Sequence, residues 1–449
     1  MNNQGELIET ALTARLESCC EENGDYWSFR GMAFRQHAHA YFQYPAMMVP
    51  QMVGELLAAI GEGSPEAKHV YDPFAGSGTV LTETMLRGMD FTGQDINPLA
   101  ILLCKAKTIP FFDSALEDKV EAVLEFTRED QSRALEAEFA NRHKWFTDRV
   151  SVGLSKLRRA IRAEAMLLAR RFLWVALAET VRRSSNSRTS TFKLHIRPKK
   201  EIDDGRPSPI EVFKEVVERN LEHLRTQKLI LEERGYIERG RYKGAVDVRI
   251  ADSSQTEKGP GSGPHYDVLV TSPPYGDNAT TVPYGQHSYL PLQWIDLTDI
   301  EANIDTRCLD TTHEIDRRSL GGSRKGIKQV RDGLRGTSKT LADTLDGLKN
   351  QPADREARVL AFCRDLDRSV GPVMEVLRPG AVMIWVVGNR RVGGRPVPLD
   401  RILTDLLESR GVKHLLSLSR TIPSKRMAVR NCVADTIRAE TIVVLRKGI

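Results

Sequence analysis

The sequence of 449 residues lacks any apolar run long enough to cross a lipid bilayer. The nearest candidate, AEAMLLARRFLWVALAETV, carries Arg170 and Arg171 at its centre, which predicts an amphipathic or buried helix instead. The N-terminus, MNNQGELIETAL, has no basic start followed by an apolar block, so we expect no secretory signal and no membrane association.

Cysteine is scarce as well. Six cysteines (Cys19, Cys20, Cys104, Cys308, Cys363 and Cys432) are scattered, with no CxxC pair. No Cys/His spacing is typical of a zinc site, so we expect no metal centre. Free thiols of this kind predict a reducing, cytoplasmic setting.

The net charge is only +5, but the charge is unevenly distributed. Residues 142–200 hold 16 Lys and Arg against three acidic residues, while the flanking sequences are acidic. A second basic segment, at 317–339, is rich in Gly and Ser. Such segments indicate either a surface that binds a polyanion or a solvated helical face, and the sequence leaves both interpretations open.

Strand and helix patterns alternate along much of the chain. KHVYDPF predicts a strand, AGSGTVLTETMLRG a glycine-rich turn opening a helix, and MDFTGQDINPLA a second strand, all within the length of a βαβ unit. Further strands are predicted at 245–254, 266–275 and 380–389, and a closing antiparallel pair at 414–420 and 441–447. This alternation predicts an α/β fold with a mostly parallel, Rossmann-like sheet and helices on both faces.

Two long segments interrupt the alternation and are predicted to be insertions. We expect a first core half at 1–110, a mainly helical basic insertion at 111–240, core strands at 241–298, a Gly/Ser-rich basic insertion at 299–355 and a closing core segment at 356–449. Ser114 and Glu117 have the spacing of a capping box and predict a helix start there.

The stretch DPFAGSGT, from Asp72 to Thr79, follows a strand and opens a helix. Gly76 and Gly78 would let the backbone turn tightly and approach a ligand, and the helix amides would face it. The stretch is not GxGxxG and lacks the P-loop lysine, which disfavours a dinucleotide or a nucleoside triphosphate. Asp95 ends the next strand, where a carboxylate can accept both hydroxyls of a ribose or can cap the helix before Pro98.

Two further strand ends carry polar residues. Asp252 ends a third strand and would either reach an adenine edge or form a turn. TSPPYGDN follows the fourth strand, and its two prolines fix the backbone and leave carbonyls without neighbouring donors. Such carbonyls could accept hydrogen bonds from an amine, and Tyr275 could stack on a flat base. A rigid structural turn is the alternative.

DPFAGSGT and TSPPY together resemble the cofactor and catalytic motifs of amino-group DNA methyltransferases. Ser272 as the first motif residue resembles the cytosine-N4-specific group, and HAYFQYPAMMVPQMVGELL resembles that group's N-terminal cofactor motif, with Met47 where relatives often have lysine. The resemblance covers roughly 37–109, 245–295 and, loosely, 355–449. It implies S-adenosylmethionine as cofactor, bound by Tyr44, Pro45, Asp72, Pro73, Phe74, Ala75, Gly76, Ser77, Gly78, Thr79, Asp95, Ile96, Asn97 and Asp252.

The same resemblance implies a catalytic loop made by Ser272, Pro273, Pro274 and Tyr275. It would transfer a methyl group directly to the N4 amine of a cytosine flipped out of double-stranded DNA. Methylation at cytosine carbon 5 is disfavoured because the chain has no Pro-Cys pair. Adenine N6 is the first alternative target, and a non-catalytic DNA-binding subunit is the second.

The basic insertions are then predicted to contact DNA, through Arg182, Arg183, Arg188, Arg324, Lys325 and Lys328. The aromatic residues of 284–294 are predicted as a group to belong to the core, although some could wall the base pocket. The sequence leaves open the recognition site, the oligomeric state and whether a cognate restriction endonuclease accompanies the protein.

Overall fold

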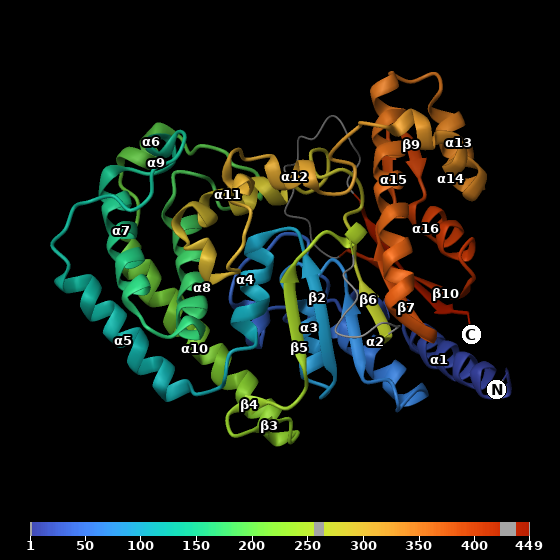
Figure 1. The fold of residues 1–449 in the computed structure, drawn as a ribbon, viewed down its shortest axis with the longest axis horizontal. Coiled ribbons are helices and arrows are strands. Elements are labelled where there is room, and N and C mark those ends of the chain that lie inside the picture. The colour runs from blue at the N-terminus through green and yellow to red at the C-terminus, as the bar shows by residue number, and fades with distance from the viewer. Residues whose placement is uncertain (1, 256–264, 423–436, 449) are drawn as a thin grey trace.

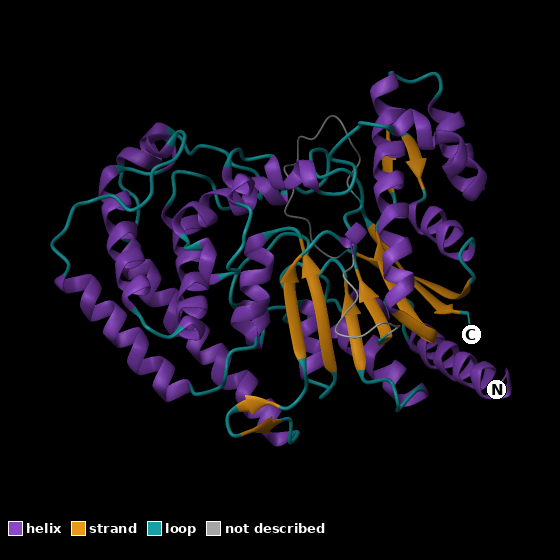
Figure 2. Cartoon of the chain, viewed as in Figure 1, coloured by secondary structure: helices purple, strands orange, loops and turns teal. Residues whose placement is uncertain are grey.

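A seven-stranded sheet forms the centre of the protein, in the order β10-β11-β7-β6-β1-β2-β5 (Figures 1 and 2). The computed structural model describes residues 2–255, 265–422 and 437–448. The strands are β1 (His69–Asp72), β2 (Asp90–Asp95), β5 (Val246–Ile250), β6 (Tyr266–Thr271), β7 (Leu377–Val387), β10 (Val412–Thr421) and β11 (Ala439–Lys447).

Strands β5, β2, β1, β6 and β7 run parallel to one another. Strand β11 pairs antiparallel with β7, and β10 pairs antiparallel with β11. The α/β class with a Rossmann-like, mostly parallel sheet is therefore confirmed, as is the closing antiparallel pair.

The sheet is buried on both faces. Along β1 and β6, Val70 and Val268 face one apolar cluster, while Tyr71 and Leu269 face another, as the two-residue period of a strand requires. The first cluster includes residues of α1 (Asn2–Glu22), α2 (Pro50–Gly63), α3 (Thr79–Met85) and α4 (Pro98–Lys107). The second includes residues of α14 (Lys339–Leu348), α15 (Ala353–Val376) and α16 (Leu399–Glu408). Burial on both faces explains why the strands are nearly continuous apolar runs.

Helices fill the segment between β2 and β5 and lie on one side of the sheet (Figure 1). They are α5 (Asp113–Glu129), α6 (Arg142–Trp145), α7 (Asp148–Ala163), α8 (Leu167–Ser184), α9 (Lys199–Asp203) and α10 (Pro209–Glu233), followed by a hairpin of β3 (Ile237–Glu238) and β4 (Arg241–Tyr242). The expected capping box is wrong: α5 begins at Asp113, Phe112 is its N-cap, and no side chain caps it. Glu117 instead forms an ion pair with Arg225 of α10.

Helix α8 contains the apolar stretch that carries Arg170 and Arg171. It is packed inside the core, which confirms the predicted buried helix. Arg170 forms a bidentate ion pair with the Asp299 carboxylate, and Arg171 donates to the backbone carbonyl of Asp299. Within the described residues, no helix is both long and apolar enough to cross a membrane.

A second group of helices follows β6. It consists of α11 (Tyr284–Trp294), α12 (Glu314–Arg318) and α13 (Ile327–Thr337), and α14 continues it. Figure 1 shows α11 and α12 beyond the upper ends of the strands and α13 with α14 next to α15. Trp294 is fully buried, as expected for the aromatic residues of 284–294, and Trp385 in β7 is fully buried as well. The cysteines that the structure describes are all free, and Cys432 lies outside the described residues.

Candidate active site

The loops after β1, β2, β5 and β6 meet at one edge of the sheet, because the parallel strands end there together. They enclose a pocket of about 840 Å³, counted with the space open to solvent. Its lining includes predicted cofactor residues Tyr44, Pro45, Pro73, Phe74, Ala75, Gly76, Ser77, Thr79, Asp95, Ile96, Asn97 and Asp252, and predicted catalytic residues Ser272 and Pro274. Asp72, Gly78, Pro273 and Tyr275 are not among the lining residues.

The glycine loop has the backbone that its sequence predicts. Gly76 and Gly78 have φ angles of +50° and +75°, a region that favours glycine. A Cβ at Gly78 would also lie 2.9 Å from the Cys104 sulfur, so a larger residue would not fit without a shift. The Gly76 N–H donates to Asp95 Oδ2 at 2.9 Å, which ties the loop to the end of β2.

Asp95 does not cap helix α4, which was the alternative to a ribose contact. The N-cap of α4 is Asn97, whose Oδ1 accepts from the Leu99 N–H at 3.1 Å. Asp95 Oδ1 accepts from the Asn97 N–H at 2.8 Å, and burial raises the pKa of Asp95 to about 6. Each carboxylate oxygen therefore has one backbone partner and keeps a lone pair for a ligand hydroxyl.

Asp72 lies beneath the same loop and is fully buried. Its Oδ1 accepts from Thr271 Oγ1 at 2.6 Å and from the Phe74 N–H at 3.0 Å. Its Oδ2 is buried and has no hydrogen-bond partner among the described residues. Burial, with a smaller contribution from the charge of Asp95, raises the pKa of Asp72 to about 7.

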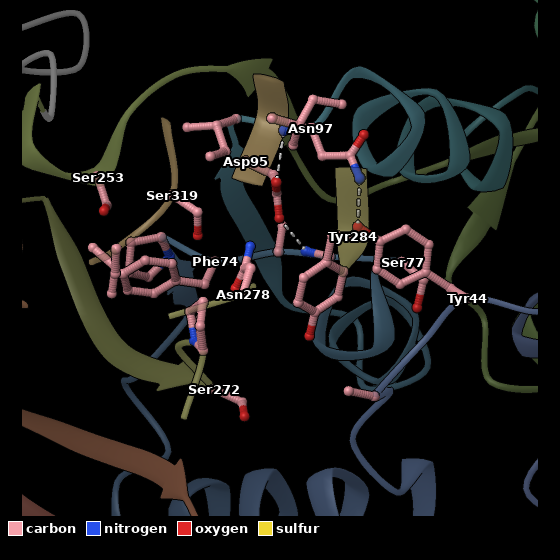
Figure 3. A pocket seen from close by; sticks show the side chains of 18 of the residues that line it. Tyr44, Phe74, Ser77, Asp95, Asn97, Ser253, Ser272, Asn278, Tyr284 and Ser319 are labelled. Atoms are coloured by element: carbon pink, nitrogen blue, oxygen red, sulfur yellow. Dashed lines mark hydrogen bonds between the residues drawn. The ribbon is translucent and has the colours of Figure 1, made fainter. Parts of the chain in front are cut away.

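Two tyrosines form one wall of the pocket. The rings of Tyr44 and Tyr284 lie 5.8 Å apart between centroids, and the Tyr44 hydroxyl accepts from Asn97 Nδ2 at 2.9 Å. Figure 3 shows them on the opposite side of the pocket from Phe74, with Asp95 between. At the rim, Asp252 Oδ1 accepts from the N–H and the hydroxyl of Ser254, both at 2.8 Å, so Asp252 forms a turn and also lines the pocket.

The Ser-Pro-Pro-Tyr turn follows β6, which ends at Thr271. Ser272 Oγ lies 3.0 Å from the Val386 carbonyl oxygen and 3.1 Å from the Tyr275 hydroxyl. The Tyr275 ring packs on Gly388, where a Cβ would be 2.5 Å from ring carbon Cδ2. The Tyr275 hydroxyl donates to Glu440 Oε1 at 3.0 Å. Stacking of Tyr275 on a base stays a prediction.

Asn278 is a pocket residue that the sequence analysis missed. It is 2% exposed, and its Nδ2 donates to Asp316 Oδ1 at 3.1 Å. A carboxylate without a proton only accepts, so this contact fixes the amide orientation, and Asn278 Oδ1 has no partner among the described residues. Asp316 lies in α12, which also brings Ile315 and Arg318 to the pocket. No local pattern near Asn278 signals this contact with a residue 38 positions away.

The predicted DNA-binding cations differ in what surrounds them. Arg182 pairs with Glu179 at 2.8 Å, Arg183 pairs with Glu215 at 2.8 Å, and Arg324 pairs with Asp354. The other three cations, Arg188, Lys325 and Lys328, are exposed and form no ion pair with a described residue.

Most arginines of the basic segment 142–200 are neutralised in the same way. Its arginines pair with acidic residues before and after the segment, including Asp130, Glu136 and Asp299. Arg188 and Lys193 in the loop after α8, and Lys199 and Lys200 at the start of α9, are exposed and form no ion pair with a described residue. The charge imbalance in the sequence thus overstates the free charge on the surface.

Comparison with known proteins places this site in a family. No family model matches the chain. Two structures of the rRNA methyltransferase aviRa from Streptomyces viridochromogenes align over 90% and 92% of this chain and 86% and 96% of theirs, at 13% and 14% identity. Both have a TM-score of 0.28, which is too low to relate the folds. The type II methyltransferase M.MvaI of Kocuria varians is 31% identical over 456 residues, covering 98% of this chain and 97% of that protein. The chain therefore belongs to the type II methyltransferase family.

Proposed function

We propose that this protein transfers a methyl group from S-adenosylmethionine to the N4 amine of cytosine in double-stranded DNA. The observation that carries the proposal is that Ser272 and Pro274 line the same pocket as the glycine loop and Asp95. Ser272 can accept a hydrogen bond from an amine and Asp95 can accept hydrogen bonds from the hydroxyls of a ribose, and both face this one cavity. Ser272 as the first residue of the turn supports cytosine over adenine, through the resemblance to the cytosine-N4 group.

The pocket fits the proposed cofactor chemically. Asp95 offers carboxylate lone pairs to ribose hydroxyls, and Tyr44 and Tyr284 offer flat apolar surface. The unpartnered Asp72 Oδ2 and the carboxylate of Asp95 favour a cationic ligand nearby. When bound, the cofactor supplies an electrophilic methyl group on a sulfonium.

The residues of this chain would then orient the amine. An exocyclic amine shares its lone pair with the ring and is a weak nucleophile. Hydrogen bonds from the amine to Ser272 Oγ and to the Pro273 carbonyl would favour a tetrahedral nitrogen whose lone pair is free to attack. Positioning and electrostatics supply most of the catalysis in such a site. The base must leave the duplex to reach it.

The loop after α8 and the start of α9 form the best supported DNA surface. Their exposed cations Arg188, Lys193, Lys199 and Lys200 have no ion-pair partner among the described residues. Lys325 and Lys328, just before and in α13, offer a second cluster. DNA bound between the two clusters would have its backbone charge neutralised on both sides of the flipped base. A DNA substrate also implies that the protein acts in the cytoplasm.

Nucleoside analysis tests the proposed product. DNA from cells that express the protein should contain N4-methylcytosine, and DNA from cells that express Ser272→Ala should contain much less. N6-methyladenine alone would assign the adenine alternative. An unmodified DNA, with S-adenosylmethionine binding intact by calorimetry, would assign the non-catalytic alternative.

A salt titration tests the DNA surface. Replacing Arg188, Lys199 and Lys200 by Gln should weaken DNA binding and reduce the slope of log affinity against log salt by about two to three. The matched control replaces Arg239, Arg241 and Lys243, which are exposed on the β3–β4 hairpin at the opposite end of the sheet (Figure 1). Equal slopes for both triple variants would contradict the assignment.

A further inference from the structure

A chain of partly buried hydrogen bonds leads away from the pocket behind Ser272. It runs from Ser272 Oγ to the Tyr275 hydroxyl at 3.1 Å and from there to Glu440 Oε1 at 3.0 Å. Glu440 lies in β11, 165 residues from Tyr275 along the sequence. We call these three residues the Ser272–Glu440 chain.

The Glu440 carboxylate at the end of this chain fixes which group donates in the Tyr275–Glu440 hydrogen bond. A carboxylate only accepts, so the Tyr275 hydroxyl donates to Glu440. The Tyr275 oxygen and the Val386 carbonyl oxygen, which is 3.0 Å from Ser272 Oγ, are then the two acceptors open to the Ser272 hydroxyl. With its hydrogen on either of them, Ser272 Oγ presents a lone pair to the pocket that it lines, and a turn of the hydroxyl from Val386 to Tyr275 completes the path. Ser272 is thereby set to accept from an amine.

Glu440 has a charged partner, and burial keeps Tyr275 neutral. Arg420 of β10 forms an ion pair with Glu440 Oε2, and it is held by the Trp27 carbonyl at 3.1 Å. The side chain of Arg420 is 4% exposed and that of Glu440 is 15% exposed. Burial, together with the charge of Glu440, raises the pKa of Tyr275 well above its usual value. Among the residues that the structure describes, the charged or titratable groups that face Glu440 are thus Arg420, Tyr275 and, at longer range, Tyr284.

We propose that the Ser272–Glu440 chain carries the proton that the methylated amine must lose. The inference rests on the proposed methyl transfer to an amine. When the nitrogen lone pair forms the new N–C bond and the C–S bond breaks, the nitrogen becomes positively charged. Its N–H proton passes to Ser272 Oγ, the serine proton passes to Tyr275, and the tyrosine proton passes to Glu440. The product leaves neutral, and the carboxylate ends protonated until solvent restores it.

This role does not depend on which base is methylated, since cytosine N4 and adenine N6 both lose one proton. It also gives Tyr275 a function different from stacking. A stacking tyrosine needs its ring, whereas the proton path needs its hydroxyl. Tyr275→Phe therefore separates the two roles, because it keeps the ring and removes the hydroxyl.

The test measures single-turnover transfer of a labelled methyl group to DNA by wild type, Tyr275→Phe, Glu440→Gln and the double variant. Each single variant should be about 100-fold slower, within the range for proton transfer by a positioned group. The double variant should be no slower than either, because the two residues act in one path. The lost rate should recover in part as pH or the concentration of a small buffer base rises.

Three readouts other than rate exclude a structural cause. The affinities for cofactor and for DNA should stay within about threefold of the wild-type values. The melting temperature should stay within a few degrees of wild type. Tyr242→Phe is the matched control, since it removes a tyrosine hydroxyl that donates to the Met89 carbonyl far from the pocket. Wild-type rates in Tyr275→Phe and Glu440→Gln, or losses that multiply in the double variant, would overturn the inference. A wild-type protein that binds cofactor and transfers no methyl group would instead refute the proposed function.

Discussion

Asp72→Asn should make the ligand-free protein more stable above neutral pH. The pKa of Asp72 rises from 3.8 to about 7 because the carboxyl is fully buried and Oδ2 has no partner among the described residues. A folded-state pKa above the unfolded value means that the group favours folding below pH 4. That contribution is lost as the pH rises toward 7. A shift of about three pKa units corresponds to about 4 kcal/mol.

The asparagine keeps an acceptor for Thr271 Oγ1 and Phe74 N–H and removes the buried charge. Its amide hydrogens lack an acceptor, which costs about 1–3 kcal/mol. At pH 8 the variant should therefore gain about 1–3 kcal/mol in free energy of unfolding. Because the wild-type contribution changes with pH, the difference between variant and wild type should grow by about 2.5 kcal/mol from pH 5 to pH 8.

Urea unfolding of both proteins at pH 5 and pH 8 measures this difference. Asp247→Asn is the control, because Asp247 is an exposed carboxylate on strand β5 of the same sheet. A difference between Asp72→Asn and wild type that is the same at the two pH values would refute the assigned burial cost. So would a variant that is less stable than wild type at pH 8.

Three other changes have definite expected outcomes. Asp95→Ala should weaken the thermal stabilisation by S-adenosylmethionine, and an unchanged affinity in a folded variant would contradict the ribose contact. Asn278→Ala should weaken cofactor or DNA binding about tenfold by removing a buried acceptor, as measured by calorimetry, and normal affinity for both would remove Asn278 from the site. Asp299→Asn should lower the free energy of unfolding by about 3–5 kcal/mol by leaving Arg170 unpaired, while Asp305→Asn on the exposed surface should change it little.

Local patterns in the sequence predicted the parts of the site that depend on few neighbours. A glycine with positive φ at Gly78 follows from a tight turn between strand and helix. The position of Asp95 at the end of β2 follows from strand periodicity, and parallel strands end at one edge. These features, and the order of strands and helices, can therefore be predicted from residues that are close together in the sequence. The capping prediction at Ser114 was wrong even at short range, because the N-cap of α5 is Phe112, two residues earlier.

Only the tertiary structure decided which polar groups meet. The Tyr275 hydroxyl reaches Glu440 because β11 returns between β7 and β10, a pairing that no local pattern specifies. Asn278 reaches Asp316 because α12 lies over the pocket. Arg183, counted as free charge in the sequence, is neutralised by Glu215 from another helix. Composition and periodicity describe each segment alone, whereas hydrogen bonds and ion pairs depend on how separate segments pack.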